Sequence, residues 1–363
     1  MRIVLWVIIM LKKKKDDGLN YLIEENQKVY RSAIQKQVRN KQINDAYRLV
    51  RNVIILGAIV GSSIYFFSLW YFRHIPVKAQ MPFNNSVMNQ LIIEKTRPMT
   101  YDEVPFEMFS HTALLINLTN GRVLFDHGSL ERIYPASVTK IMTVLVGLNN
   151  ANLDDEFVLR FDADFLWLNQ ATVAGFVNGE TRTLSEVLHG IMLPSGADAT
   201  WALANHIAGD YESFVSLMND MARVIGMTNT HFVTATGLHD DDHFTTADDI
   251  AKLVKYALEN PSFREIFTSI VYELPRPNAA GSFMNSTLLA APSLAFDGGS
   301  IIGGRTGFTT QTGRSLASIA RSDDGEEFLL ITFGAPDETW TQTAIAIEDA
   351  RIIYEYFVNR IPQ

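Results

Sequence analysis

The strongest local signal in this chain is an apolar segment that begins at Ser137-Val138-Thr139-Lys140. Pro135 precedes it, and Ile141 to Leu148 are largely apolar. Proline is favoured near the start of a helix, and the run ends at Gly147-Leu148-Asn149-Asn150. The pattern therefore predicts one buried helix over about 137–148, around which the rest of the domain is organised.

Two side chains at the start of this helix form a candidate catalytic pair. Residues three apart share a helix face, so the Lys140 amine can reach the Ser137 hydroxyl. A serine hydroxyl is a weak nucleophile until a base takes its proton, and a lysine buried in apolar surroundings can lose its charge and act as that base. Free N–H groups at the helix N-terminus can stabilise the negative charge that follows attack. Ser-x-x-Lys occurs by chance about once in a chain of this length, so other motifs have to support it.

A second segment predicts attachment to a membrane. Val53 to Phe72 are 20 consecutive residues without a charge, and the segment ends in Trp70-Tyr71-Phe72, which is typical of a membrane–water boundary. The 20 residues before it carry five Lys or Arg, and the 20 after it carry two. The positive-inside rule then predicts a single-pass protein of the cell membrane, with its N-terminus in the cytoplasm and everything beyond residue 73 outside. A cleaved signal peptide does not fit, because about 50 mostly polar residues come first.

The charge is unevenly distributed along the chain. Residues 1–52 contain 12 Lys and Arg against 5 Asp and Glu, so their net charge is +7. The remaining residues have a net charge of −16, which gives −9 for the whole chain. An acidic main domain argues against nucleic acid as a partner, whereas a basic tail fits anionic lipid head groups. The absence of cysteine excludes thiol catalysis, disulfides and cysteine-bound zinc.

These features predict four regions. They are a basic cytoplasmic tail (1–52), a transmembrane helix (53–72), an extracytoplasmic stalk containing several prolines (73–107) and a folded domain (108–363). The apolar stretch Ile3 to Leu11 is too short to span a bilayer. It is interpreted either as a weak interfacial anchor or as residues upstream of a true start at Met10.

The folded domain passes from strands to helices and back to strands. Thr119-Asn120-Gly121 between two apolar runs indicates a hairpin, and Thr183-Leu184-Ser185-Glu186 is a capping box that opens a helix through Met192. Further helices are predicted at Ala197–Ala208, Phe214–Ile225, 247–259 and Ala344–Phe357, and strands at Thr112–Leu118, Arg122–Phe125, Ile270–Leu274, Arg314–Arg321 and Glu327–Phe333. Strands at both ends with helices between them predict an α+β domain, in which a sheet is covered by helices.

Two more short motifs could carry chemistry. The helix break at Ser195-Gly196-Ala197 presents a hydroxyl on a tight turn, and Gly303 to Thr309 brings a cation, a hydroxyl and flexible backbone to the edge of the sheet. Glycines permit close approach of the backbone to a ligand, and a guanidinium can bind a carboxylate through two hydrogen bonds. Taken singly, Ser195 is more simply a helix cap and Arg305 a surface charge.

Together, the three motifs resemble the S-x-x-K, S-x-N and K-T-G signature of penicillin-binding proteins and serine β-lactamases. Their context resembles the D-alanyl-D-alanine carboxypeptidases among the low-molecular-mass penicillin-binding proteins, over about residues 108–335. The stretches that carry the resemblance are Tyr134–Thr143, Met192–Ala199, Gly226–Phe232, Thr236–Asp240, Thr246–Ile250 and Gly303–Thr309. The resemblance implies the penicillin-binding-protein-like transpeptidase fold, an antiparallel sheet covered by helices with a helical subdomain.

The resemblance also implies a role for each motif residue. Ser137 would form the acyl-enzyme, Lys140 would be the general base, and Ser195 would relay a proton between the base and the leaving amine. The terminal carboxylate of the substrate would be bound by the first two residues of the third motif, and the oxyanion hole would be formed by the backbone N–H groups of Ser137 and Phe308. The implied substrate-binding residues are Arg305, Thr306, Gly307 and Phe308. No cofactor is implied.

Two positions depart from the family pattern. Ala197 stands where the second motif usually has Asn, which removes an amide expected near Lys140 and the substrate carbonyl, worth about 1–3 kcal/mol if nothing replaces it. Arg305 stands where the third motif usually begins with Lys. The charge is kept, but arginine does not release its proton, so proton transfer through that position is closed. These departures bear on turnover rather than on the family.

The leading hypothesis is a membrane-anchored serine D,D-carboxypeptidase. It would remove the terminal D-alanine from peptidoglycan stem peptides that end in D-Ala-D-Ala, and β-lactams would inhibit it covalently. One alternative is a penicillin-binding sensor or wall-binding scaffold that acylates slowly or not at all. Another is a β-lactamase, which would need a deacylating Glu on a loop, whereas Glu212 and Glu259 both fall in predicted helices.

One rival motif is weighed against this hypothesis. His239-Asp240-Asp241-Asp242-His243 places two histidines four apart, as zinc peptidases do. The intervening residues are all acidic and Gly237 precedes them, which predicts a loop rather than a helix. No metal site is therefore assigned.

Overall fold

The computed structural model describes residues 98–278, 280–336 and 344–360. The predicted cytoplasmic tail, the transmembrane helix at 53–72 and most of the predicted stalk lie outside the described residues. Among the residues that are described, no helix is both long and apolar enough to cross a membrane.

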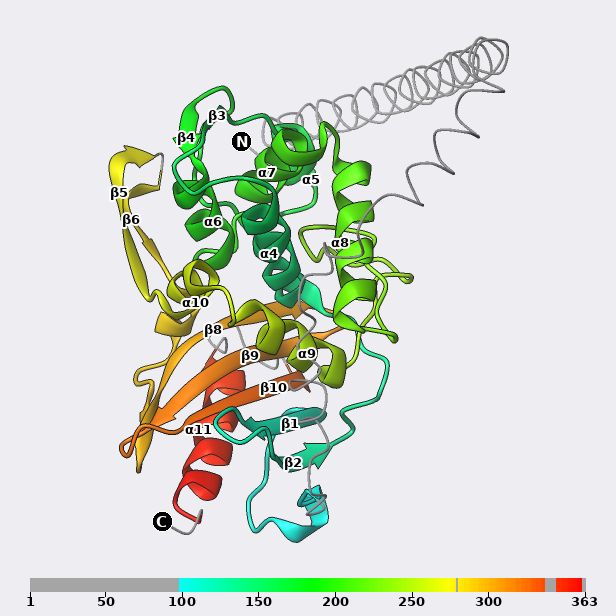
Figure 1. Cartoon of the computed structure of the whole chain (residues 1–363), viewed down its shortest axis with the longest axis vertical. Helices are drawn as coiled ribbons and strands as arrows, with labels where there is room; N and C mark the ends of the chain where they lie inside the picture. The colour runs from blue at the N-terminus through cyan, green and yellow to red at the C-terminus, as the bar shows by residue number, and fades with distance from the viewer. Residues whose placement is uncertain (1–97, 279, 337–343, 361–363) are drawn as a thin grey trace, which may run out of the picture. The chain divides into compact units, whose positions relative to one another are not determined.

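A six-stranded antiparallel sheet forms the centre of the described domain (Figure 1). Its strand order is β2-β1-β10-β9-β8-β7. The strands are β1 (Thr112–Asn117), β2 (Val123–His127), β7 (Ala295–Phe296), β8 (Gly299–Thr309), β9 (Gly313–Ser322) and β10 (Glu327–Ala335). Because β1 pairs with β10, with Leu115 opposite Leu330, the two ends of the domain meet in one sheet.

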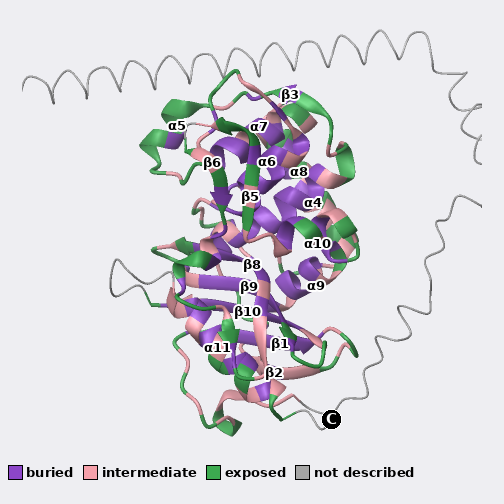
Figure 2. Ribbon diagram, turned by 90° about the vertical axis from the view of Figure 1, so that its left-hand side faces the viewer, coloured by how far each residue is buried: buried purple, intermediate pink, exposed green. Residues whose placement is uncertain are grey.

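Each face of the sheet is covered by a different layer of helices. Successive side chains of a strand point to opposite faces. Leu114 and Ile116 of β1 therefore belong to the apolar core shared with most of the helices, whereas Ala113 and Leu115 belong to the core shared with α11 (Ala344–Val358). The central strands β8, β9 and β10 are mostly buried between these layers (Figure 2).

The helix α4 (Lys140–Asn150) lies at the centre of the larger helical layer and is buried along most of its length. The helices that pack against it are α6 (Leu184–Met192), α7 (Ala197–Ala208), α8 (Tyr211–Ile225), α9 (Ala247–Ala257) and α10 (Pro261–Thr268). The remaining elements are α5 (Ala163–Leu168), the strand pairs β3 (Glu156–Val158) with β4 (Thr181–Thr183) and β5 (Val271–Asn278) with β6 (Gly281–Asn285), and the 3₁₀ turns η1 (Tyr101–Glu103), η2 (Ala136–Thr139) and η3 (Thr287–Ala290).

The local signals in the sequence are mostly confirmed. The Thr183–Glu186 capping box opens α6, and both of its reciprocal hydrogen bonds are present. The break after α6 and the helix Ala197–Ala208 are also as predicted. The predicted hairpin joins β1 and β2, and Gly121 takes a positive φ of 74° in its turn. The predicted α+β class is therefore confirmed for the described domain.

Two expectations about elements near the motifs need correction. The helix predicted from residue 137 begins only at Lys140, because the preceding residues form the tighter turn η2, in which the Lys140 N–H bonds to the Ser137 carbonyl. The long strand β8 is not predicted by the sequence pattern, since its four glycines between 299 and 307 lower its strand propensity. It is a strand because it pairs with β9 along most of its length.

Candidate active site

Ser137 and Lys140 are adjacent in space, at the junction between η2 and α4. The Lys140 Nζ lies 3.3 Å from the Ser137 Oγ and donates a shorter hydrogen bond, of 2.6 Å, to the Thr236 carbonyl. Ser137 remains partly exposed, whereas Lys140 is 2% exposed. Ala136, directly before the serine, has a φ of 47°, a strained conformation of the kind that is concentrated at functional sites. The nucleophile candidate is accessible and its amine partner is not.

The surroundings of Lys140 favour a neutral amine. Burial lowers its pKa well below the usual value, and the positive charge of Arg305 lowers it further, while the negative charge of Asp198 acts in the opposite direction. A lysine whose pKa is lowered in this way can hold a free electron pair at ordinary pH. This is the property that a general base requires.

The turn between α6 and α7 brings a second hydroxyl to the same point. Ser195 Oγ lies 3.1 Å from Ser137 Oγ, and Ser195 is only 6% exposed. Its backbone has a φ of 73°, a left-handed conformation that costs a non-glycine residue about 1–2 kcal/mol. The Ser195 and Ser137 hydroxyls, from residues 58 apart in the sequence, therefore meet within hydrogen-bond distance.

Arg305 of β8 lies beneath the nucleophile rather than on the surface. It is 1% exposed, and its Nε donates to the Ser137 carbonyl at 3.2 Å while its Nη1 donates to the Met192 carbonyl at 2.7 Å. Burial lowers its pKa to about 9. The interpretation of this residue as a plain surface charge is therefore wrong. Its guanidinium joins the end of α6 to the serine turn, by which we mean η2 (Ala136–Thr139). It also places a positive charge next to Lys140.

The next residues of β8 run past the serine turn. A Cβ on Gly307 would lie 3.1 Å from the Ser137 backbone nitrogen and 2.6 Å from the Ser315 Oγ, so only glycine lets the strand approach this closely. Thr306 Oγ1 donates to Thr287 Oγ1 at 2.7 Å. Phe308 follows with 37% of its surface exposed, and the Arg314 guanidinium lies 4.2 Å from its ring centre. The structure thus brings Lys140, Ser195, Arg305 and Gly307 together around Ser137, and Thr306 and Phe308 flank Gly307 on β8.

Asp198 is a site residue that sequence analysis did not single out. Its buried carboxylate accepts hydrogen bonds from four backbone N–H groups, those of Ala174, Gly175, Phe176 and Ala199. These bonds hold the loop after α5 against the start of α7, directly after the Ser195 turn. Burial raises the pKa of Asp198. The only hint of this role in the sequence is that Asp198 is an acidic residue in the first turn of a predicted helix, where a negative charge is favoured.

The two histidines of the rival metal motif point to different partners. His243 is buried, its Nδ1 accepts the Val233 N–H at 2.9 Å and its Nε2 lies 2.8 Å from Thr139 Oγ1. His239 instead packs edge-on against Tyr134, with 4.7 Å between ring centres. Burial lowers the pKa of His243 to about 3, so it is a neutral structural residue. In the described part of the chain, no group of three or more His, Cys, Asp or Glu side chains could hold a metal ion.

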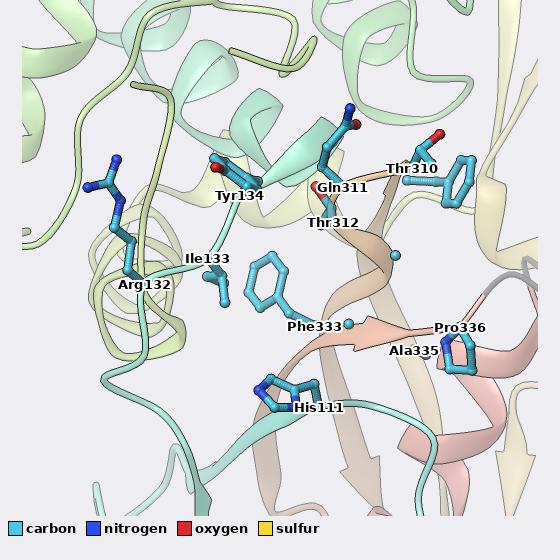
Figure 3. A pocket seen from close by; sticks show the side chains of 13 residues that line it. His111, Arg132, Ile133, Tyr134, Thr310, Gln311, Thr312, Phe333, Ala335 and Pro336 are labelled. Atoms are coloured by element: carbon cyan, nitrogen blue, oxygen red, sulfur yellow. The ribbon is translucent and has the colours of Figure 1, made fainter. Parts of the chain in front are cut away.

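A cavity of about 710 Å³ adjoins this site (Figure 3). Tyr134, Gln311 and Thr312 lie along one side of it and His111 and Pro336 along the other, with the Phe333 ring between them. The serine turn does not line it. The cavity reaches the site through Tyr134, three residues before the nucleophile, and through Phe308 of β8.

Gly237 is expected to be intolerant of any side chain. It has a φ of 79°, and a Cβ there would lie 1.9 Å from the Ala136 carbonyl oxygen. Gly237→Ala should therefore displace the serine turn and lower the free energy of unfolding by about 2–4 kcal/mol. Urea unfolding measures this loss.

Gly121→Ala is the matched control, because Gly121 has a similar φ of 74° but open space around it. The free energy of unfolding of that variant should fall by only about 1–2 kcal/mol. Equal effects of the two substitutions would show that contact with the serine turn is unimportant.

Comparison with known proteins gives a consistent result. A family model described as D-alanyl-D-alanine carboxypeptidase, of the S11 peptidases, matches residues 99–337. The chain is 33% identical over 252 residues to the D-alanyl-D-alanine carboxypeptidase DacF of Bacillus subtilis, covering 67% of this chain and 62% of that protein. It is 30% identical over 176 residues to the D-alanyl-D-alanine carboxypeptidase of Streptomyces sp. strain K15, covering 46% of this chain and 60% of that protein.

The similarity extends to solved structures. The crystal structure of the Streptomyces K15 DD-transpeptidase superposes with a TM-score of 0.61 at 26% identity, covering 70% of this chain and 99% of that one. The alignments span 60–65% of the length of the first three curated relatives.

Proposed function

Because this chain belongs to the D-alanyl-D-alanine carboxypeptidase family of S11 serine peptidases, we propose that it removes the terminal D-alanine from peptidoglycan stem peptides through an acyl-enzyme on Ser137. The single observation that supports this most strongly is the cluster of Ser137 Oγ with Lys140 Nζ at 3.3 Å and Ser195 Oγ at 3.1 Å. This arrangement provides a nucleophile, a base and a proton relay at one point.

The proposed reaction has two halves. In the first, Ser137 Oγ attacks the carbonyl carbon between the two terminal D-alanines while neutral Lys140 takes the hydroxyl proton. The peptide C–N bond then breaks, Ser195 passes a proton to the leaving nitrogen and regains one from Lys140, and D-alanine departs. In the second half, a water molecule attacks the ester, the neutral Lys140 accepts its proton and then gives it to Ser137 Oγ, which leaves as the hydroxyl.

The substrate would be oriented along β8. The backbone N–H groups of Ser137 and Phe308 are proposed as the oxyanion hole, which the close passage of Gly307 by the Ser137 nitrogen supports. Thr306 and Arg305 are proposed to bind the terminal carboxylate. Because the Arg305 Nε and Nη1 already bond to backbone carbonyls, its main contribution would be a buried positive charge close to that carboxylate.

Covalent inhibition by β-lactams is part of the same proposal, because the strained lactam amide presents the same kind of carbonyl to Ser137. A second candidate is a penicillin-binding scaffold that acylates but turns over slowly. It is favoured by Ala197, which is 2% exposed and offers no side-chain amide to the substrate.

Release of D-alanine tests the enzymatic proposal. The purified protein should become labelled by a fluorescent penicillin and should also release free D-alanine from a pentapeptide that ends in D-Ala-D-Ala. Labelling without release would favour the scaffold. A protein that is not labelled and releases no D-alanine would rule out both candidates. Rapid hydrolysis of the penicillin itself would indicate a β-lactamase.

We also propose that residues 53–72 anchor the protein in the cell membrane with the folded domain outside. The uncharged segment and the excess of Lys and Arg before it support this orientation. A protease added to intact cells should digest the 105–363 region and spare the 1–52 tail. Digestion of the tail with protection of the domain would show that the orientation is reversed.

A further inference from the structure

The Lys140 amine has to be oriented as well as neutral. A neutral amine has two N–H donors and one electron pair, and only the pair can accept the Ser137 proton. The bond of 2.6 Å to the Thr236 carbonyl occupies one donor and so leaves the pair free to face Ser137, whose Oγ is 3.3 Å away. The orientation of the base therefore depends on the position of one backbone carbonyl.

That carbonyl belongs to a segment with no helix or strand of its own. Residues 234–238 form an irregular turn, so no ladder of backbone hydrogen bonds holds Thr236 in place. Side chains from two helices are among its fixed points. Thr143 of α4 donates to the Ala235 carbonyl at 2.7 Å, and Tyr211 of α8 accepts the Thr236 N–H of the same peptide.

The Tyr211 hydroxyl makes three contacts with this turn. It accepts the Ala235 N–H at 2.9 Å and the Thr236 N–H at 3.2 Å, and it donates to Thr236 Oγ1 at 3.4 Å. Burial raises the pKa of Tyr211, so the phenol stays neutral and keeps both its donor and its acceptor functions. One side-chain oxygen thus bonds two successive N–H groups next to the carbonyl that holds Lys140.

The Tyr211 ring is itself fixed by aromatic packing. It stacks on Trp201 of α7 with 4.3 Å between ring centres and an interplanar angle of 25°, and Trp201 contacts Phe165 of α5 at 5.2 Å. The same helix α7 begins directly after the Ser195 turn. The packing therefore links the turn that holds the Lys140 amine to α7, the helix that follows Ser195.

We infer that Tyr211 is a positioning residue for the proposed reaction: its hydroxyl fixes the Ala235–Thr236 backbone, and through the Thr236 carbonyl it directs the electron pair of Lys140 toward Ser137. The Tyr211 hydroxyl bonds to Ala235 and Thr236 and acts on the reacting atoms only through them. This inference rests on the proposed function, because it concerns the acylation of Ser137.

Tyr211→Phe is the direct test, since it removes the hydroxyl and keeps the ring that stacks on Trp201. Two buried N–H groups then lose their acceptor, and the turn shifts to recover hydrogen bonds. We expect the maximal rate of penicillin acylation to fall by about 10- to 100-fold, because small misplacements of catalytic groups have effects of this size. The drug concentration that gives half the maximal rate should change by less than about twofold. Tyr256→Phe, at a 40% exposed site on α9, is the matched control and should retain the wild-type rate.

A double-mutant cycle with Lys140→Ala separates positioning from general destabilisation. If Tyr211 acts through Lys140, adding Tyr211→Phe to Lys140→Ala should slow the residual acylation by less than about twofold. A structural defect would instead add its full effect in both backgrounds, and that result would overturn the inference even if Tyr211→Phe were poorly folded. An unchanged rate in the single variant Tyr211→Phe would also overturn it while leaving the proposed function intact. Failure of the wild-type protein to react would refute the proposed function, and the inference with it.

Discussion

Ser137→Ala should abolish the β-lactam adduct that we propose for the wild-type protein. Attack by the Ser137 oxygen opens the strained lactam ring, and the amide nitrogen stays attached to the drug, so the protein gains one whole drug mass. Intact-protein mass spectrometry after exposure to penicillin measures this gain directly. No described side chain other than Ser137 combines partial exposure with an Oγ within reach of the Lys140 amine at 3.3 Å.

Ser195→Ala is the informative control for this result. Ser195 Oγ is only 3.1 Å from Ser137 Oγ, so it is the nearest alternative nucleophile. The Ser195→Ala protein should still carry the adduct, and peptide mapping should locate it at Ser137. An adduct on the Ser137→Ala protein, or none on the wild type at high drug concentration, would contradict the assignment of the nucleophile.

Lys140→Ala should slow the formation of that adduct by about 10²–10⁴-fold, which is the usual contribution of a general base. Lys140→Arg should be nearly as slow, because a guanidinium keeps its proton and cannot accept one from Ser137. Stopped-flow or gel-based labelling with a fluorescent penicillin gives the rate. Lys255→Ala on α9 is the control, and its rate should equal that of the wild type.

The same base predicts the direction of the pH dependence. Burial and Arg305 hold the pKa of Lys140 well below its usual value, and only the neutral amine accepts the proton. The acylation rate of the wild type should therefore rise as the pH is raised through that lowered pKa and then level off. In the Lys140→Ala protein this rise should disappear. A rise that persists without Lys140 would assign the titration to another group.

The sequence alone determined those features that depend on neighbours along the chain. Side-chain caps and turns act over three or four residues, which is why the Thr183–Glu186 box, the Asn-Gly hairpin and the break at Ser195 were predicted at the right positions. The spacing of Ser137 and Lys140 also required no tertiary knowledge. The motifs in their order were enough to indicate the family.

Only the tertiary structure decided what these residues do to one another. The strand β8 is rich in glycine, and long-range pairing with β9 overrides its weak local preference. Arg305 was predicted to bind the substrate carboxylate, but its burial beneath the serine turn follows only from the packing of β8. That burial is also why its charge acts on Lys140. The sequence gives no role to Tyr211 or to Thr236, although Thr236 begins one of the stretches that carry the resemblance, because their part is played by a backbone carbonyl and a single hydroxyl brought together by packing. Hydrogen bonds between residues 24 to 168 apart in sequence leave no periodic pattern, so their partners become visible only when the chain is folded.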